Sequence, residues 1–182
     1  MTVTEQEMRY LSQLLEACQR CVFFLSSSSS KILWPLDSSI LEQRNKDAEF
    51  FETLSAVNER FAKLQDTLAL SMRHAAELLG EPVDYFLKVI VLFEKLGVIS
   101  SREAWQEGRV VRNMAAHDYE TDYQLIAEHF NALHELEPML YQTAANLMDC
   151  SEKALGVKPA SNTFQPEFDA VIERMQASVS SK

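Results

Sequence analysis

Apolar residues recur every three or four positions along most of the chain, which is the spacing of an amphipathic helix. The first such stretch runs from Glu5 to Leu25, and its apolar members share one face: Met8, Leu11, Leu14, Leu15, Cys18, Val22 and Leu25. The polar run Ser26–Ser30 follows and predicts a flexible loop. Trp34-Pro35 then forms a turn, after which Ser38 or Ser39 is expected to cap the next helix.

A second helical pattern extends from this turn to Leu79 without a Gly or a Pro. Its apolar positions include Phe50, Phe51, Leu54, Val57, Phe61, Leu64, Leu68 and Met72. A straight helix of roughly 40 residues would be about 60 Å long. We therefore expect a break near Arg44–Asp47, and an end at Gly80-Glu81-Pro82, where both helix-interrupting residue types occur.

Two shorter helices are expected next. The first covers Asp84 to Leu96 and is closed by Gly97 as its C-cap. Ser100 and Glu103 lie three residues apart, the spacing of a capping box, and predict the start of a helix that ends near Asp118.

The remaining pattern predicts a helix from Tyr123 to about Met148, in which Pro138 would introduce a kink. A loop over Gly156–Pro166 precedes Glu167–Ala177, which is either a short terminal helix or a tail ordered only by a partner. With no internal repeat and no strand-like alternation, the sequence predicts an all-α antiparallel helical bundle of about five helices. We expect residues 1–37 to form an N-terminal helix and Ser-rich loop, 38–150 the bundle, and 151–182 a C-terminal tail.

Composition supports a helical globular protein. The 182 residues include only 4 Gly and 5 Pro, too few for the frequent tight turns of an all-β fold, and 47% are hydrophobic, enough for a core. No apolar run approaches the roughly 20 residues of a membrane span. An acidic start before the short apolar patch Cys21–Leu25 does not resemble a secretory signal, and three Cys give no disulfide framework. These features predict a cytoplasmic protein with no membrane association.

The formal net charge of −10 argues against non-specific coating of nucleic acid. The charge is uneven, because residues 120–182 hold ten acidic and four basic residues, whereas Arg102–Arg112 has a small positive balance.

The cysteines and histidines do not indicate a metal site. Cys18 and Cys21 have metal-ligand spacing without a second pair, and His129 and His134 lie about 140° apart on a helix. We read all four as structural or surface residues, and expect neither a metal nor another cofactor.

One stretch combines side chains that handle phosphate. Arg109, Asn113 and His117 follow one another at i, i+4 spacing and would line one stripe of a helix, with Arg112 beside it and Tyr119 just beyond. Arginine offers a permanently charged fork to phosphate oxygens, and imidazole can accept or donate a proton. The alternative is that Arg and His merely bind the carbonyls at the helix end, and spacing alone favours that interpretation.

The segment Arg112-Asn113-x3-His117-x-Tyr119 resembles the RxxxxHxY motif of the HEPN superfamily, specifically its HepT-like branch. The pattern of helices from about Glu49 to Leu147 fits as well, so this part of the chain is expected to be HEPN-like. The resemblance implies a homodimer formed through the motif helices, in which two Arg/His pairs meet across the two-fold axis.

Active members of this family are metal-independent endoribonucleases. By resemblance, Arg112 would hold the scissile phosphate, His117 would transfer protons as the 2′-hydroxyl attacks, and Asn113, with Arg109 nearby, would orient the substrate. HepT-like proteins are typically toxins paired with an MntA-like nucleotidyltransferase antitoxin that adenylylates the motif tyrosine, here Tyr119. The implied function is therefore an RNA-cleaving toxin.

Two other interpretations stay open. The chain could be a non-catalytic, substrate-binding HEPN subunit of a nucleotidyltransferase, or a structural helical dimer in which Arg112 and His117 only stabilise the interface. The presence of Arg, Asn, His and Tyr together favours the ribonuclease and the binding subunit over the structural dimer.

Overall fold

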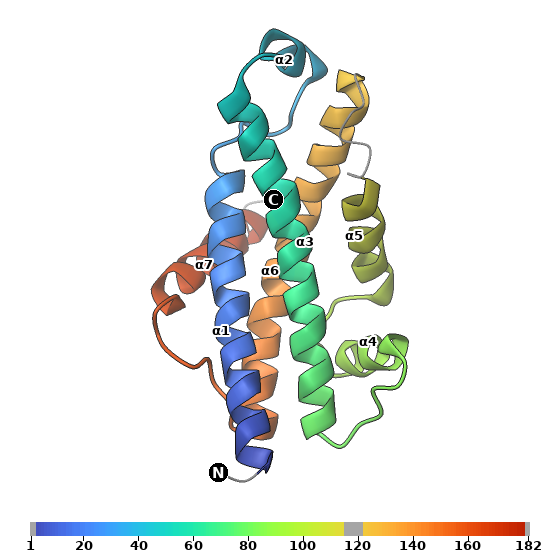
Figure 1. Cartoon of the computed structure of the whole chain (residues 1–182), viewed down its shortest axis with the longest axis vertical. Coiled ribbons are helices and arrows are strands. Elements are labelled where there is room, and N and C mark those ends of the chain that lie inside the picture. The colour runs from blue at the N-terminus through green and yellow to red at the C-terminus, as the bar shows by residue number, and fades with distance from the viewer. Residues whose placement is uncertain (1–2, 115–121, 181–182) are drawn as a thin grey trace.

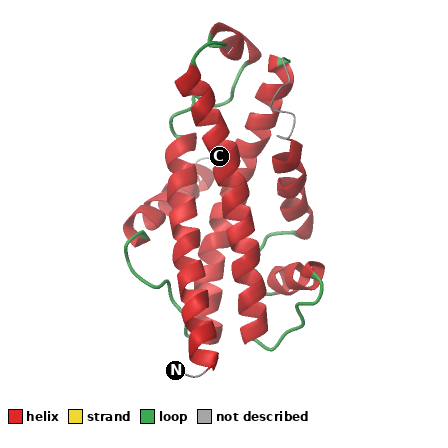
Figure 2. Cartoon of the chain, viewed as in Figure 1, coloured by secondary structure: helices red, strands yellow, loops and turns green. Residues whose placement is uncertain are grey.

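A computed structural model describes residues 3–114 and 122–180 of the chain, and within these ranges it contains seven helices and no strand. The helices, shown in Figures 1 and 2, are α1 (Val3–Ser29), α2 (Ser38–Gln43), α3 (Ala48–Leu78), α4 (Phe86–Lys95), α5 (Arg102–Met114), α6 (Tyr123–Leu155) and α7 (Gln165–Ser180). The all-α prediction is confirmed. The expected number of about five helices is too low, because the long second pattern divides into α2 and α3 and α7 is a helix in its own right.

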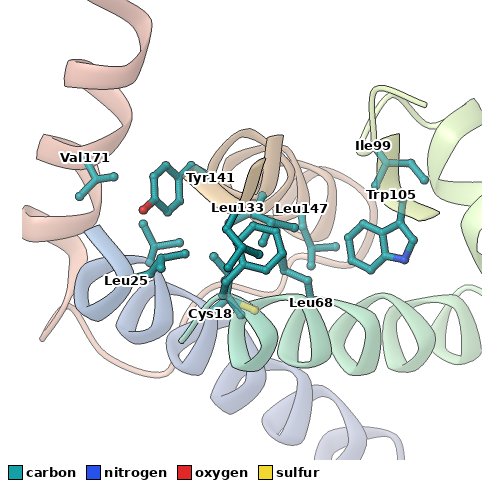
Figure 3. Packing of buried hydrophobic residues seen from close by; sticks show 14 of the residues in the cluster. Cys18, Leu25, Leu68, Ile99, Trp105, Leu133, Tyr141, Leu147 and Val171 are labelled. Carbon is teal, nitrogen blue, oxygen red and sulfur yellow. The ribbon is translucent and has the colours of Figure 1, made fainter. Parts of the chain in front are cut away.

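Three long helices form the centre of the molecule (Figure 1). Helix α1 runs antiparallel to both α3 and α6, while α3 and α6 run in the same direction because α4 and α5 carry the chain back between them. The bundle is therefore only partly antiparallel. The core between these helices is continuous and includes fully buried Leu25, Leu68 and Leu133 (Figure 3). Removing such side chains from water is the main force that holds the helices together.

The serine run is helical, so the expectation of a flexible loop there is wrong. Helix α1 continues to Ser29, and both Ser28 and Ser29 are buried. Neighbouring helices supply partners: Arg60 of α3 donates to the Ser28 hydroxyl, and Ser29 Oγ lies 3.1 Å from Nδ1 of His134 on α6. A short polar side chain has low helix propensity, but these tertiary hydrogen bonds override it.

The break near Arg44–Asp47 is confirmed, since α2 ends at Gln43 and α3 begins at Ala48. Asp47 caps α3 by accepting a 3.0 Å hydrogen bond from the amide of Phe50. The N-cap of α2 is Asp37 rather than Ser38 or Ser39, both of which lie within the helix. A carboxylate is an effective acceptor for the free amides of a first turn.

The start of α5 also differs in detail from the predicted capping box. Ser101, not Ser100, accepts the 3.0 Å hydrogen bond from the amide of Ala104. A carboxylate from another helix also acts at this helix start, because Glu94 on α4 accepts a 3.0 Å hydrogen bond from the amide of Arg102. The local signal located the helix start, while the packing of α4 against α5 selected the acceptor.

The C-terminal part of the chain is more helical than its sequence pattern indicated. Helix α6 includes Pro138 and extends to Leu155, where Gly156 adopts a left-handed conformation with φ of 67°. Helix α7 packs against α1, its Phe168 and Val171 are buried in the same core, and Gln165 accepts a 2.7 Å hydrogen bond from Gln19. The terminal segment is thus ordered by the chain itself.

Candidate functional site

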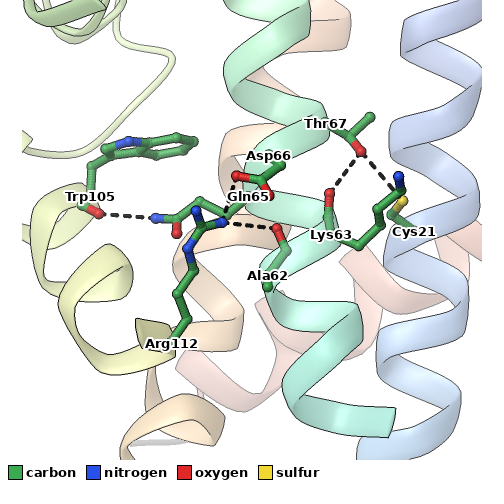
Figure 4. A network of polar contacts seen from close by, with 8 residues as sticks. All are labelled: Cys21, Ala62, Lys63, Gln65, Asp66, Thr67, Trp105 and Arg112. Atoms are coloured by element: carbon green, nitrogen blue, oxygen red, sulfur yellow. Dashed lines mark hydrogen bonds and ion pairs between the residues drawn. The ribbon is translucent and has the colours of Figure 1, made fainter. Parts of the chain in front are cut away.

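Helix α5 carries the described part of the candidate motif and is fixed to α3 by its inner face. Trp105 is fully buried, and its carbonyl oxygen accepts a 3.0 Å hydrogen bond from Gln65 Nε2 (Figure 4). Gly108 allows the close approach, because a Cβ at that position would lie only 3.0 Å from the same nitrogen. These contacts fix the distance between α5 and α3 and the rotation of α5 about its own axis.

This rotation turns Arg112 toward α3. Its Nη1 donates to the carbonyl oxygen of Ala62 at 3.0 Å and to Oδ1 of Asp66 at 2.6 Å (Figure 4). The Arg112 side chain is 14% exposed and the Asp66 side chain 64% exposed. The guanidinium is thus held at the edge of the α3–α5 interface, with its carboxylate partner on the solvent side.

Arg109 and Asn113 are exposed on the side of α5 next to Arg112, and Val110 and Met114, which are 61% and 57% exposed, lie farther round the helix. The predicted stripe therefore holds for Arg109 and Asn113, and Arg112 lies beside it but points to a different neighbour. His117 and Tyr119 lie outside the described residues. The last two turns of α5 combine one anchored and one exposed cation with an exposed carboxamide.

Sequence reasoning missed Asp66 and Ala62 as neighbours of Arg112. Asp66 lies 46 residues earlier in the chain and is one of several exposed acidic residues on α3. Helical periodicity places Asp66 on the outer face of α3, but it carries no information about which helix covers that face. Only the docking of α5 makes the two side chains partners.

The histidines and cysteines outside the motif take part in packing or hydrogen bonds within the fold. His134 stacks on Trp34 with ring centroids 4.3 Å apart, and His129 Nε2 lies 3.3 Å from the Asn58 side-chain oxygen. The described residues contain no group of three or more His, Cys, Asp or Glu that could hold a metal ion. Burial raises the pKa of the Cys18 thiol to about 12 and also raises the pKa of Cys21. Thiols with raised pKa values are poor nucleophiles at neutral pH.

Searches against protein-family models, curated proteins and solved structures found no match. Among the helices that the structure describes, none combines the length and the apolar character needed to cross a bilayer.

Proposed function

We propose that this protein is a metal-independent endoribonuclease of the HEPN type. The carrying observation is the end of α5, where Arg112 is anchored to α3 while Arg109 and Asn113 point to solvent within the same turns of helix. Two guanidinium groups and a carboxamide on adjacent turns of one helix are groups of the kind that bind phosphodiesters. The resemblance of Arg112-Asn113-x3-His117-x-Tyr119 to the RxxxxHxY motif adds the proton-transfer group.

The proposed reaction is an internal transesterification. The 2′-oxygen of a ribose attacks the adjacent phosphorus and forms a 2′,3′-cyclic phosphate, while the bond to the 5′-oxygen breaks. His117 takes the proton of the 2′-hydroxyl or returns one to the leaving 5′-oxygen. Arg112 neutralises charge that builds up on the phosphate oxygens, and Asn113 and Arg109 orient the strand. The reaction exchanges one phosphorus–oxygen bond for another and moves one proton from the 2′-oxygen to the 5′-oxygen, so it needs neither a metal nor a co-substrate.

We further propose that the protein acts as a homodimer through α5. Val110 and Met114 are apolar and more than half exposed, and Leu125 at the start of α6 is 51% exposed. A second copy packed on this face would bury them and would bring two sets of basic side chains together. Cyclic two-fold symmetry is the commonest way for identical chains to associate. Sedimentation at micromolar concentration tests this: a monomer contradicts the dimer, and Val110→Glu should dissociate it.

As the toxin of a toxin–antitoxin pair, the protein would be neutralised by an MntA-like nucleotidyltransferase that adenylylates Tyr119. The added phosphodiester carries about one negative charge and would compete with RNA for Arg112. Tyr119→Phe should then escape neutralisation and show no adenylate mass shift on co-expression with the partner. An unmodified wild-type protein, or an adenylate elsewhere, contradicts this part of the proposal.

A non-catalytic, substrate-binding subunit of a nucleotidyltransferase is the second candidate. The observation that favours it is the ion pair between Arg112 and Asp66, which already occupies one nitrogen of the guanidinium. On this alternative the motif contributes to binding, and purified protein does not cleave RNA.

Cleavage of RNA by purified variants separates the two candidates. Arg112→Ala and His117→Ala should each lower the rate by about 10²–10⁴-fold, since each removes a group that acts in the transition state. Arg44→Ala is the matched control, because Arg44 is also paired with an aspartate, Asp47, at 2.7 Å and lies outside the motif. Activity should survive a chelator. Unchanged cleavage in both motif variants would refute the ribonuclease, and no cleavage by wild type would favour the binding subunit.

A further inference from the structure

The ion pair between Arg112 and Asp66 engages only one of the three guanidinium nitrogens. Both hydrogen bonds, to Ala62 and to Asp66, use Nη1 of Arg112 (Figure 4). Within the described residues, no hydrogen bond reaches Nη2 or Nε. A guanidinium presents five N–H groups in a planar fork, so its other edge can still bind two oxygens of a phosphate.

An anion bound at that edge would remain close to Asp66. Arg112 keeps its contact with the Ala62 carbonyl and is only 14% exposed, so the guanidinium has little room to turn away. Asp66 is 64% exposed, so its carboxylate lies on the side from which a solvent-borne anion approaches. The carboxylate therefore lowers the attraction of the site for every anion, and lowers it more for an anion of higher charge.

We propose that Asp66 is a specificity-determining residue of the Arg112 site, which selects singly charged phosphodiesters against doubly charged terminal phosphates. This inference rests on the proposed function in so far as Arg112 binds a phosphate. An internal RNA phosphate carries one negative charge, whereas a phosphate monoester carries close to two at pH 8. The pairing would thus direct the site to the interior of an RNA strand and away from free nucleotides and phosphorylated ends.

The size of the effect follows from the geometry of the guanidinium. Anions on two edges of one guanidinium are separated by about 5–6 Å. At this distance, and with the dielectric constant of water, the repulsion between two unit charges changes a binding constant by about fourfold. A dianion meets about twice the repulsion, which weakens its binding constant by about 16-fold. Asp66 is therefore expected to contribute about fourfold discrimination, and more where protein lowers the local dielectric constant.

The test compares two ligands that cannot be cleaved and that differ in phosphate charge: thymidylyl-thymidine, a diester, and thymidine 5′-monophosphate. Dissociation constants are measured at pH 8 and low salt by NMR titration of wild type, Asp66→Asn and Asp149→Asn. Asp149 is a suitable control because it is also an exposed aspartate, is paired with Lys153 at 4.0 Å, and lines the groove between α6 and α7. Each ligand serves as its own reference, so differences in base contacts cancel.

Asp66→Asn should bind the monophosphate about 16-fold and the diester about fourfold more tightly than wild type, while Asp149→Asn should change both by less than twofold. Adding Arg112→Gln to Asp66→Asn should abolish the gain. The inference is overturned if Asp66→Asn changes the binding of both ligands equally, binds either ligand more weakly than wild type, or binds neither. It is also overturned if the gain persists when Arg112 is replaced. Asp66→Ser, judged by the same criteria, replaces Asp66→Asn if circular dichroism shows that variant to be unfolded.

These binding measurements do not depend on RNA cleavage. If the ribonuclease proposal fails because the protein does not cut RNA, the selectivity of the Arg112 site is still measured by the two ligands. If selectivity fails while Arg112→Ala and His117→Ala abolish cleavage, the ribonuclease stands and only the role of Asp66 is wrong.

Discussion

Trp105 is expected to hold α5, and with it the candidate site, to the core. Its side chain is fully buried, and the inner face of α5 has only Trp105 and Gly108 as buried residues. Trp105→Ala would remove the largest apolar side chain in this interface and leave a cavity. Substitutions of this kind cost about 3–5 kcal/mol, a large fraction of the roughly 5–15 kcal/mol by which a domain is stable.

Trp105→Phe provides the matched comparison. Among the described residues, the indole nitrogen of Trp105 has no hydrogen-bond partner although it is buried. Phenylalanine loses some packing volume but also removes this unsatisfied donor, whose burial costs about 1–3 kcal/mol. The two effects oppose each other, so Trp105→Phe should lie within about 1 kcal/mol of wild type.

Urea unfolding followed by far-UV circular dichroism measures the free energy of unfolding of each variant. Amide hydrogen exchange shows whether Trp105→Ala loses protection first in α5, as expected for a helix released from the core. A loss below about 1 kcal/mol for Trp105→Ala would refute the anchoring role, given the usual cost of such a cavity. An equal loss for Trp105→Phe would refute the account of the indole nitrogen.

Three further predictions concern buried and strained groups. Because burial raises the folded-state pKa of Cys18 to about 12, the free energy of unfolding should fall as pH rises from about 9 to 12, and Cys18→Ala should flatten this dependence in urea titrations. Glu137→Leu should cost about 1–3 kcal/mol in the same assay, because it leaves the buried Tyr141 hydroxyl without its 3.0 Å acceptor, and adding Tyr141→Phe should restore part of the loss. Gly156→Ala should lower the melting temperature, corresponding to about 1 kcal/mol, because φ of 67° disfavours a Cβ.

The sequence by itself determined the helical class and most helix positions. The three- to four-residue spacing of apolar positions located α1, α3 and α6, and Gly80 and Gly97 marked the ends of α3 and α4, although α6 continues beyond the predicted end near Met148 to Leu155. It also located the break before Asp47. These features are local: each depends on side chains within one or two turns of the same helix, so the order of residues contains the information.

Only the tertiary structure decided which partners the polar side chains have. Ser28 and Ser29 are helical because Arg60 and His134 reach them from other helices, although a serine run by itself favours a loop. The resemblance to a known motif likewise predicts that Arg112 binds phosphate, yet its immediate partner in the structure is an aspartate on α3. Long-range partners depend on which helix faces meet and at what rotation, and the packing of the whole core sets this.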